Sequence, residues 1–161
     1  IEVKNKRTIC GEPVADLKVI SSKLKGVEVP KNIVASMIDE FPILAVLAAT
    51  AEGKTEMKGI EELRVKESDR IFSMATGLRE GGVDVSYGDD YMTVEGVRRV
   101  KGGQSINTFN DHRIAMSFIC LGQVTQKPIQ ISESISIGTS FPGFIEKFKE
   151  IGANLSSQSN Q

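Results

Sequence analysis

The chain has 161 residues, 40% of them hydrophobic, which suits one globular domain with a substantial core. Its net charge of −1 and its 6% aromatic content argue against nucleic acid or a membrane as a partner. The longest apolar run, residues 43–49, is too short to cross a bilayer. Cys10 and Cys120 lack a metal-ligand spacing, so we expect no metal site and a cytoplasmic protein, with Cys120 as an inert core thiol.

Hydrophobic periodicity and turn residues predict a mixed α/β chain. The predicted strands span residues 1–9, 16–21, 27–29, 54–60, 83–87, 91–95, 105–108, 129–132 and 153–156, with a turn at 11–13. The predicted helices span residues 43–51, 68–80, 114–124 and 140–150. Pro42 suits the first turn of the first helix, and Asp111 is the expected N-cap of the third. The tail from Ser156 is expected to be frayed.

The same order of elements occurs twice along the chain. Asp39 and Asp111, which are 72 positions apart, each precede an apolar helix that is followed by a strand, an amphipathic helix and a glycine. Charged residues gather where three of the helices begin, at 39–40, 66–70 and 111–113. If the two copies pack symmetrically, these helix starts would converge on one surface. Helix N-termini with acids and arginines around them bind phosphate or carboxylate groups.

Residues 63–71 are the most charged of these segments, with five charged side chains in nine positions, directly before an apolar helical face. One interpretation is a solvated helix cap with surface ion pairs worth about 0–1 kcal/mol. The other is a site in which a base, an acid and a guanidinium hold a small anionic substrate and move a proton on it.

Two motifs carry a resemblance to a known family. Residues 63–70, Leu-Arg-Val-Lys-Glu-Ser-Asp-Arg, and residues 111–116, Asp-His-Arg-Ile-Ala-Met, resemble signature motifs of the 5-enolpyruvylshikimate-3-phosphate synthases. Residues 11–16, 39–42 and 139–142 follow the family order, so the resemblance covers nearly the whole chain, and it is closest to the bacterial class II form. Because family members are well over twice this length, we expect residues 1–161 to be part of the C-terminal domain, without the N-terminal domain.

The resemblance implies a fold of repeated βαβαββ units, an inside-out α/β barrel, of which this chain would hold about two. It also implies a reaction of aromatic amino acid biosynthesis, in the shikimate pathway. The enolpyruvyl (carboxyvinyl) group of phosphoenolpyruvate moves to the 5-hydroxyl of shikimate 3-phosphate, phosphate leaves, and no cofactor takes part. The fragment alone is expected to be inactive, to need the N-terminal domain as its partner, and to self-associate.

By the same resemblance, roles fall on individual residues. Asp39 would accept the proton of the attacking hydroxyl, and Glu67 would give a proton to the methylene carbon of phosphoenolpyruvate and later take one from it. Lys66 would bind shikimate 3-phosphate and assist proton transfer. Arg70 and Arg113 would hold phosphoenolpyruvate, since a guanidinium matches carboxylate and phosphate groups.

Other positions and other functions stay open. His112 is expected to have a supporting role, as a capping or hydrogen-bonding residue, and Glu40 and Asp69 are expected to be structural. Many family members have a lysine where this chain has Thr139, so either another cation replaces that lysine or phosphoenolpyruvate is held differently.

Two alternative functions are considered. The transferase that acts on UDP-N-acetylglucosamine uses a cysteine in a mobile loop, which neither cysteine of this chain matches. A non-catalytic scaffold or binding domain of the same fold is the other, and the acids and arginines retained in the motifs argue against it.

Overall fold

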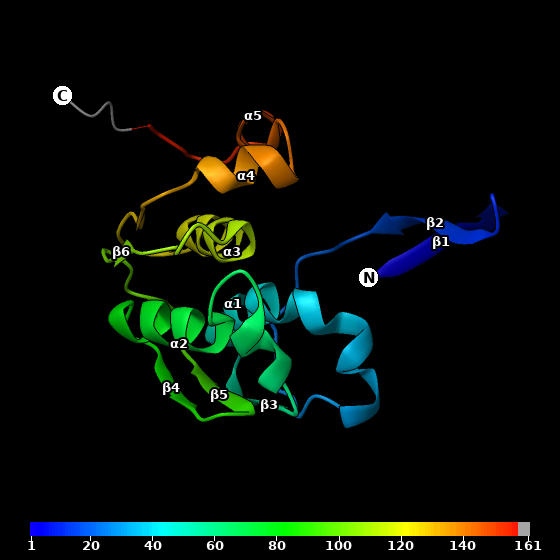
Figure 1. The fold of residues 1–161 in the computed structure, drawn as a ribbon. Coiled ribbons are helices and arrows are strands. Elements are labelled where there is room, and N and C mark those ends of the chain that lie inside the picture. Colours follow the sequence, from blue (N-terminus) through cyan, green and yellow to red (C-terminus); the bar gives the residue numbers. More distant parts are fainter. Residues whose placement is uncertain (158–161) are drawn as a thin grey trace.

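A three-stranded antiparallel sheet lies at one side of the computed structural model, which describes residues 1–157. The strands are ordered β3 (Gly53–Lys58), β5 (Tyr91–Gly96) and β4 (Asp84–Tyr87). Helices α1 (Phe41–Thr50) and α2 (Arg70–Glu80) cover one face of this sheet (Figure 1). Strands β4 and β5 form a hairpin, which joins the sheet through β5 in the register Thr55↔Val94.

A second set of elements lies on the other side of α1 and α2 (Figure 1). Helix α3 (His112–Gly122) packs on α1 and connects β6 (Ser105–Ile106) to β7 (Gln130–Ile131), which pair in parallel. Helices α4 (Ile135–Ser140) and α5 (Phe144–Glu150) form the outermost layer. A small second core joins α3 to these two helices.

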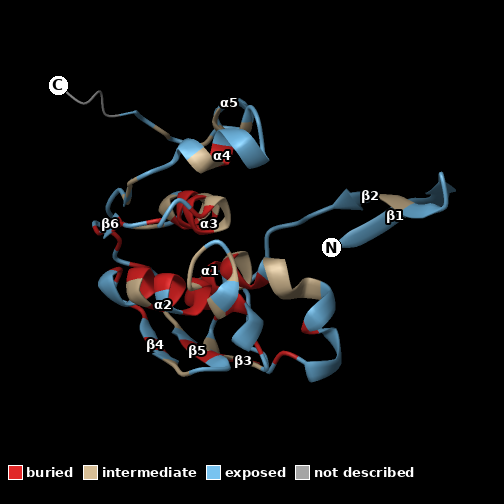
Figure 2. Cartoon of the chain, in the orientation of Figure 1, coloured by how far each residue is buried: buried red, intermediate tan, exposed pale blue. Residues whose placement is uncertain are grey.

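The helices are buried as their sequences predict. Helix α1 is apolar on nearly every side because it is enclosed between strand β5 and helix α3, and Leu47 is its exposed exception. In α2 the predicted apolar face of Ile71, Met74, Ala75 and Leu78 lies entirely in the core. Figure 2 shows this buried surface concentrated in α1, α2 and α3. No helix within residues 1–157 has the length and apolarity needed to span a membrane.

The predicted repeat is visible in the pairing of the strands. Residues 24–29 run parallel to the edge strand β3, with the amide of Gly26 donating to the carbonyl of Glu52 at 2.8 Å. Helix α1 connects these two segments, just as α3 connects β6 to β7. Each copy therefore begins with two parallel strands joined by a buried helix, and the first copy continues through α2, β4 and β5.

A β-hairpin formed by β1 (Glu2–Ile9) and β2 (Glu12–Lys18) extends away from these layers (Figure 1). Its turn falls at Cys10 and Gly11, whose φ values of 51° and 85° give the left-handed conformation of a tight turn. The predicted turn at 11–13 and strand at 16–21 are therefore displaced, because Pro13 tolerates a position in a strand that is paired on one side only.

Short 3₁₀ helices connect the larger elements. They are η1 (Lys31–Ile33), η2 (Ala35–Glu40) and η3 (Glu61–Val65). The second leads directly into α1, and the third immediately precedes the charged loop before α2.

The C-terminal part differs most from the prediction. The expected helix at 140–150 begins only at Phe144, as α5, because Gly143, with a φ of 80°, interrupts the helical path before it; helix α4, which ends at Ser140, was not predicted. The expected strand at 153–156 does not form among the described residues, and of the tail expected to be frayed, residues 158–161 lie outside the described part. Gly82 and Gly152 follow α2 and α5 with positive φ, as predicted for helix ends.

The exposed hairpin supports the prediction of self-association. Val3 and Leu17 face each other across β1 and β2, and they are 48% and 66% exposed. Exposed apolar side chains on a strand with an unpaired edge favour pairing with another copy. We expect light scattering to show oligomers of the 161-residue chain at millimolar concentration, and fewer for the variant Val3→Lys/Leu17→Lys. A clean monomer at that concentration would contradict the prediction.

Candidate active site

The starts of three helices meet, as the sequence analysis predicts. Asp39 precedes α1, the loop 66–69 precedes α2, and Asp111 precedes α3. Asp69 and Asp111 are the N-caps of their helices, since the Asp69 carboxylate accepts from the amide of Phe72 at 2.9 Å and the Asp111 carboxylate from that of Arg113 at 2.9 Å. The local sequence thus fixes where α2 and α3 begin, and side chains join them to the start of α1.

Arg70 lies at the centre of this cluster. Its side chain is 1% exposed, and its guanidinium donates to three carboxylates: to Asp111 at 2.8 Å, to Asp39 at 3.0 Å and to Glu67 at 2.5 Å. Burial alone would lower the pKa of Arg70, but these carboxylates outweigh it and raise the pKa. All three guanidinium nitrogens are therefore engaged, and a ligand would have to compete with the exposed Glu67 or Asp39 for Arg70.

Asp111 is the buried counter-charge of Arg70. Its side chain is 0% exposed and also accepts from the Ser68 hydroxyl at 3.0 Å. Burial by itself would raise the pKa of Asp111, but the hydrogen bond and charge of Arg70 lower it below its ordinary value. The carboxylate stays ionised, and it joins the loop before α2 to the first turn of α3.

Asp39 and Lys66 lie on the open side of the cluster. The Lys66 ammonium is 3.6 Å from Asp39 and 2.5 Å from Glu62. The hydrogen bond that Lys66 donates to Glu62 raises the pKa of Lys66, so the ammonium stays charged. Burial alone would raise the pKa of Asp39, but the charges of Arg113, Lys66 and Arg70 outweigh it and lower the pKa. Asp39 is therefore an ionised carboxylate that can accept a proton.

Arg113 offers free hydrogen-bond donors at this site. Its Nη1 donates to the carbonyl of Asp39 at 2.8 Å and to Glu40 at 3.1 Å. Its Nε and Nη2 have no partner among the described residues, and this edge of the guanidinium can bind a carboxylate or phosphate at two points. Arg113 also lines a shallow cavity of about 210 Å³ between α1 and α3, beside Cys120, whose thiol pKa is raised by burial.

The remaining predicted residues have simpler surroundings. Glu67 is about half exposed, and Arg70 is its one ion-pair partner among the described residues. His112 is half-buried at the first position of α3 and has no hydrogen bond or ion pair within residues 1–157. Thr139 is exposed in the last turn of α4 rather than at a helix start, and no cation contacts it in the described structure. No cluster of His, Cys, Asp and Glu in residues 1–157 is arranged to hold a metal ion.

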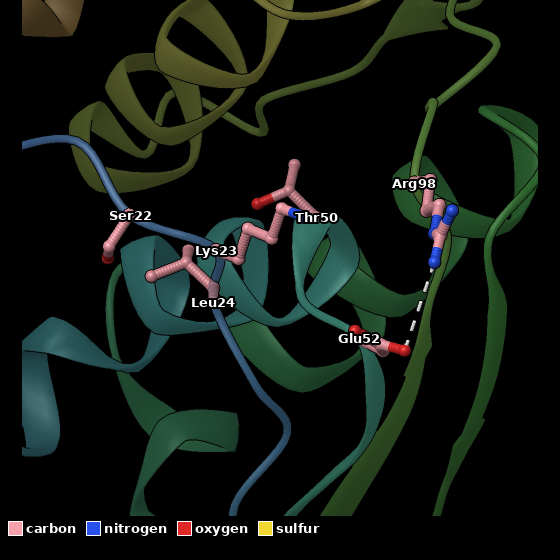
Figure 3. A pocket seen from close by; sticks show the side chains of 6 residues that line it. All are labelled: Ser22, Lys23, Leu24, Thr50, Glu52 and Arg98. Atoms are coloured by element: carbon pink, nitrogen blue, oxygen red, sulfur yellow. Dashed lines mark ion pairs between the residues drawn. The ribbon is translucent and has the colours of Figure 1, made fainter.

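Figure 3 shows the residues that line a larger cavity, of about 390 Å³, which shares no lining residue with this cluster. It is lined by residues 22–24 and by Thr50, Glu52 and Arg98, at the other end of α1. The Arg98 side chain is 89% exposed and lies 4.0 Å from Glu52. The charged groups that line this cavity are solvated, and none of the acids and arginines of the cluster lies there. We therefore do not propose this cavity as the active site.

Two features of the site were not predicted from the sequence. The pairing of Arg70 with Asp111 joins residues 41 positions apart, and no local pattern predicts such a contact. The pairing of Glu62 with Lys66 has the i, i+4 spacing and was accessible from the sequence.

Convergent helix N-termini with acids and an unpaired guanidinium edge are typical of enzymes that bind anionic substrates and transfer protons. The sequence model of EPSP synthase (3-phosphoshikimate 1-carboxyvinyltransferase) matches residues 2–148. The chain therefore belongs to the EPSP synthase family.

Individual relatives agree with this assignment. The chain is 55% identical over 156 residues to a 3-phosphoshikimate 1-carboxyvinyltransferase of Parvibaculum lavamentivorans, covering 96% of this chain and 35% of the relative. It is 51% identical over 157 residues to the one of Cereibacter sphaeroides, covering 98% and 35%.

A solved structure gives the same result for the fold. An EPSP synthase from Acinetobacter baumannii superposes with a TM-score of 0.92 at 43% identity, over 98% of this chain and 37% of that one. The predicted fold, the mixed α/β architecture of the inside-out α/β barrel, is thereby confirmed. The chain spans about a third of the length of these relatives.

Proposed function

We propose that this chain forms one side of the active site of a 3-phosphoshikimate 1-carboxyvinyltransferase. The full-length protein would transfer the carboxyvinyl group of phosphoenolpyruvate to the 5-hydroxyl of shikimate 3-phosphate, in the cytoplasm. The observation that supports this most is the convergence of Asp39, Lys66, Glu67 and Arg113 around the buried pair of Arg70 and Asp111.

The free edge of Arg113 determines how we place the substrates. Its Nε and Nη2 would hold the carboxylate or phosphate of phosphoenolpyruvate, beside the N-terminus of α3. Lys66 would bind the shikimate 3-phosphate, and its ammonium would have to leave Glu62 to do so. Arg70 would contribute to phosphoenolpyruvate binding through the nitrogens that face Asp39 and Glu67, the two exposed members of its carboxylate shell.

The reaction then needs a base that accepts the proton of the attacking hydroxyl and an acid that protonates phosphoenolpyruvate. Asp39, ionised between three cations, would accept the hydroxyl proton as the oxygen attacks the second carbon of phosphoenolpyruvate. Glu67, when protonated, would deliver a proton to the methylene carbon, which becomes a methyl group. Removal of a proton from that methyl group by Glu67 then expels phosphate and restores the double bond. No cofactor is required by this sequence of steps.

Residues 1–161 would supply part of a C-terminal domain with about two βαβαββ units, and the rest of the full-length protein would supply the opposite wall of the site. The relatives reported above are all named 3-phosphoshikimate 1-carboxyvinyltransferase, which favours this reaction over that of the UDP-N-acetylglucosamine enzyme. A non-catalytic binding domain is the remaining alternative. Phosphate release by the full-length protein, dependent on both substrates, separates the two, and its absence would refute the proposed function.

The 161-residue chain alone should release no phosphate from the two substrates. It spans about a third of its relatives, and catalysis requires both substrates to be held in a reactive geometry. The measurement is a coupled phosphate assay on the purified chain, with the full-length protein as the positive control. Turnover by the chain that depends on both substrates would show that this part already contains a complete site.

A further inference from the structure

Residues 66–68 connect η3 to α2 and contain two of the residues proposed to act on the substrates. None of these three residues takes part in a backbone-to-backbone hydrogen bond in the described structure. Lys66 itself has an extended backbone, with φ −78° and ψ −157°. The path of this loop is therefore determined by side chains, because no regular secondary structure holds it.

Arg64 joins the two ends of this loop. Its Nη1 donates to the Asp69 carboxylate at 2.6 Å, which ties the last turn of η3 to the N-cap of α2. Its Nε donates to the carbonyl of Asp89 at 2.9 Å, and its Nη2 to the carbonyl of Gly88 at 2.5 Å. One planar guanidinium thus connects η3, α2 and the turn between β4 and β5.

We infer that Arg64 is a positioning residue for Lys66 and Glu67; this inference rests on the proposed function. The turn at Gly88 and Asp89 belongs to the sheet and fixes the position of the Arg64 guanidinium. Arg64 in turn holds Asp69 at the start of α2. Arg64 holds the ends of the loop at a fixed separation, so that Glu67 reaches Arg70 and Lys66 reaches Asp39. Arg64 itself is not expected to touch substrate.

The guanidinium is required for its shape as well as its charge. Three donors of one planar group reach three acceptors, whereas a lysine ammonium has no planar fork and a shorter reach. Arg79 is a matched control, because its Nε also donates to a backbone carbonyl of β4, that of Val85, at 2.7 Å. It lies at the opposite end of α2, away from the loop.

The test compares Arg64→Lys with Arg79→Lys in the full-length protein. Displacement of reacting groups by about 1 Å is expected to reduce rates by up to about 100-fold. We expect Arg64→Lys to lower kcat by about 10- to 100-fold while KM for phosphoenolpyruvate changes much less, since Arg113 belongs to another helix. Arg79→Lys should leave kcat near that of the wild type. Equal kcat values for the two variants would overturn the inference.

A second variant and a structural measurement separate positioning from general destabilisation. Asp69→Asn keeps an oxygen to cap α2 but weakens the bond to Arg64, so it should lower kcat, and its effect should not add to that of Arg64→Lys. Hydrogen exchange of Arg64→Lys should be faster at the amides of Phe72 and Ser73, which donate to Asp69, and stay unchanged in the middle of α2. Faster exchange throughout α2, or an unchanged kcat in Asp69→Asn, would overturn the inference. If the wild-type protein lacks activity, the proposed function is wrong, and exchange at Phe72 and Ser73 still decides whether Arg64 fixes the end of the loop at Asp69.

Discussion

Replacing Asp111 with alanine should destabilise the chain by about 3–5 kcal/mol, because it leaves the buried guanidinium of Arg70 without its buried counter-charge. The substitution also removes the N-cap of α3 and the acceptor for the Ser68 hydroxyl. The free energy of unfolding of a domain is typically only about 5–15 kcal/mol, so this substitution should remove a large part of it. Urea unfolding at low protein concentration measures the difference from the midpoint and slope.

Two further variants show which part of Asp111 matters. Asp84→Ala is the matched control, because Asp84 is an exposed aspartate in β4, and surface substitutions usually change stability by less than about 0.5 kcal/mol. Asp111→Asn keeps a capping oxygen but loses the negative charge. We expect it to show most of the loss, and an asparagine variant as stable as the wild type would mean that the ion pair contributes nothing to stability.

The pH dependence of this difference follows from the lowered pKa of Asp111. A carboxyl whose pKa is lower in the folded state stabilises that state above the unfolded pKa, and the stabilisation disappears as the pH falls through the folded pKa. The free-energy difference between wild type and Asp111→Asn should therefore be complete at neutral pH. It should shrink as the pH falls below 3.8, the ordinary value for this group. A difference independent of pH over this range would contradict the ionised form of Asp111.

The elements that were predicted correctly are those with strong local signals. The apolar face of α2, the enclosed helix α1 and the N-cap Asp111 are each determined by residues a few positions apart. The C-terminal helices were harder, because α4 was not predicted and the left-handed Gly143 moves the start of α5 to Phe144. Strand 27–29 was predicted, but its pairing with β3 depends on residues about 27 positions away, such as Val29 with Glu56.

The site was predictable as a set of residues but not as a network. Charge at the helix starts indicated Asp39, Lys66, Glu67 and the two arginines, and the repeat indicated that these starts converge. Spacing could not distinguish the two arginines from each other. The structure shows Arg70 enclosed by three carboxylates and Arg113 with a free edge, a difference that depends on which helix covers which side chain.

In the full-length protein, Arg113→Lys should weaken phosphoenolpyruvate binding far more than Arg98→Lys. The free Nε and Nη2 of Arg113 can grip a carboxylate or phosphate at two points beside the N-terminus of α3. Lysine keeps the charge but loses the paired hydrogen bonds, so we expect a loss of about 2–3 kcal/mol, the scale of a hydrogen bond to a charged group. Arg98 is solvated at the edge of the other cavity (Figure 3), where its contact with Glu52 is 4.0 Å long. Steady-state kinetics should show a raised Michaelis constant for phosphoenolpyruvate in Arg113→Lys and a value near wild type in Arg98→Lys; equal constants in the two variants would place the phosphoenolpyruvate site elsewhere.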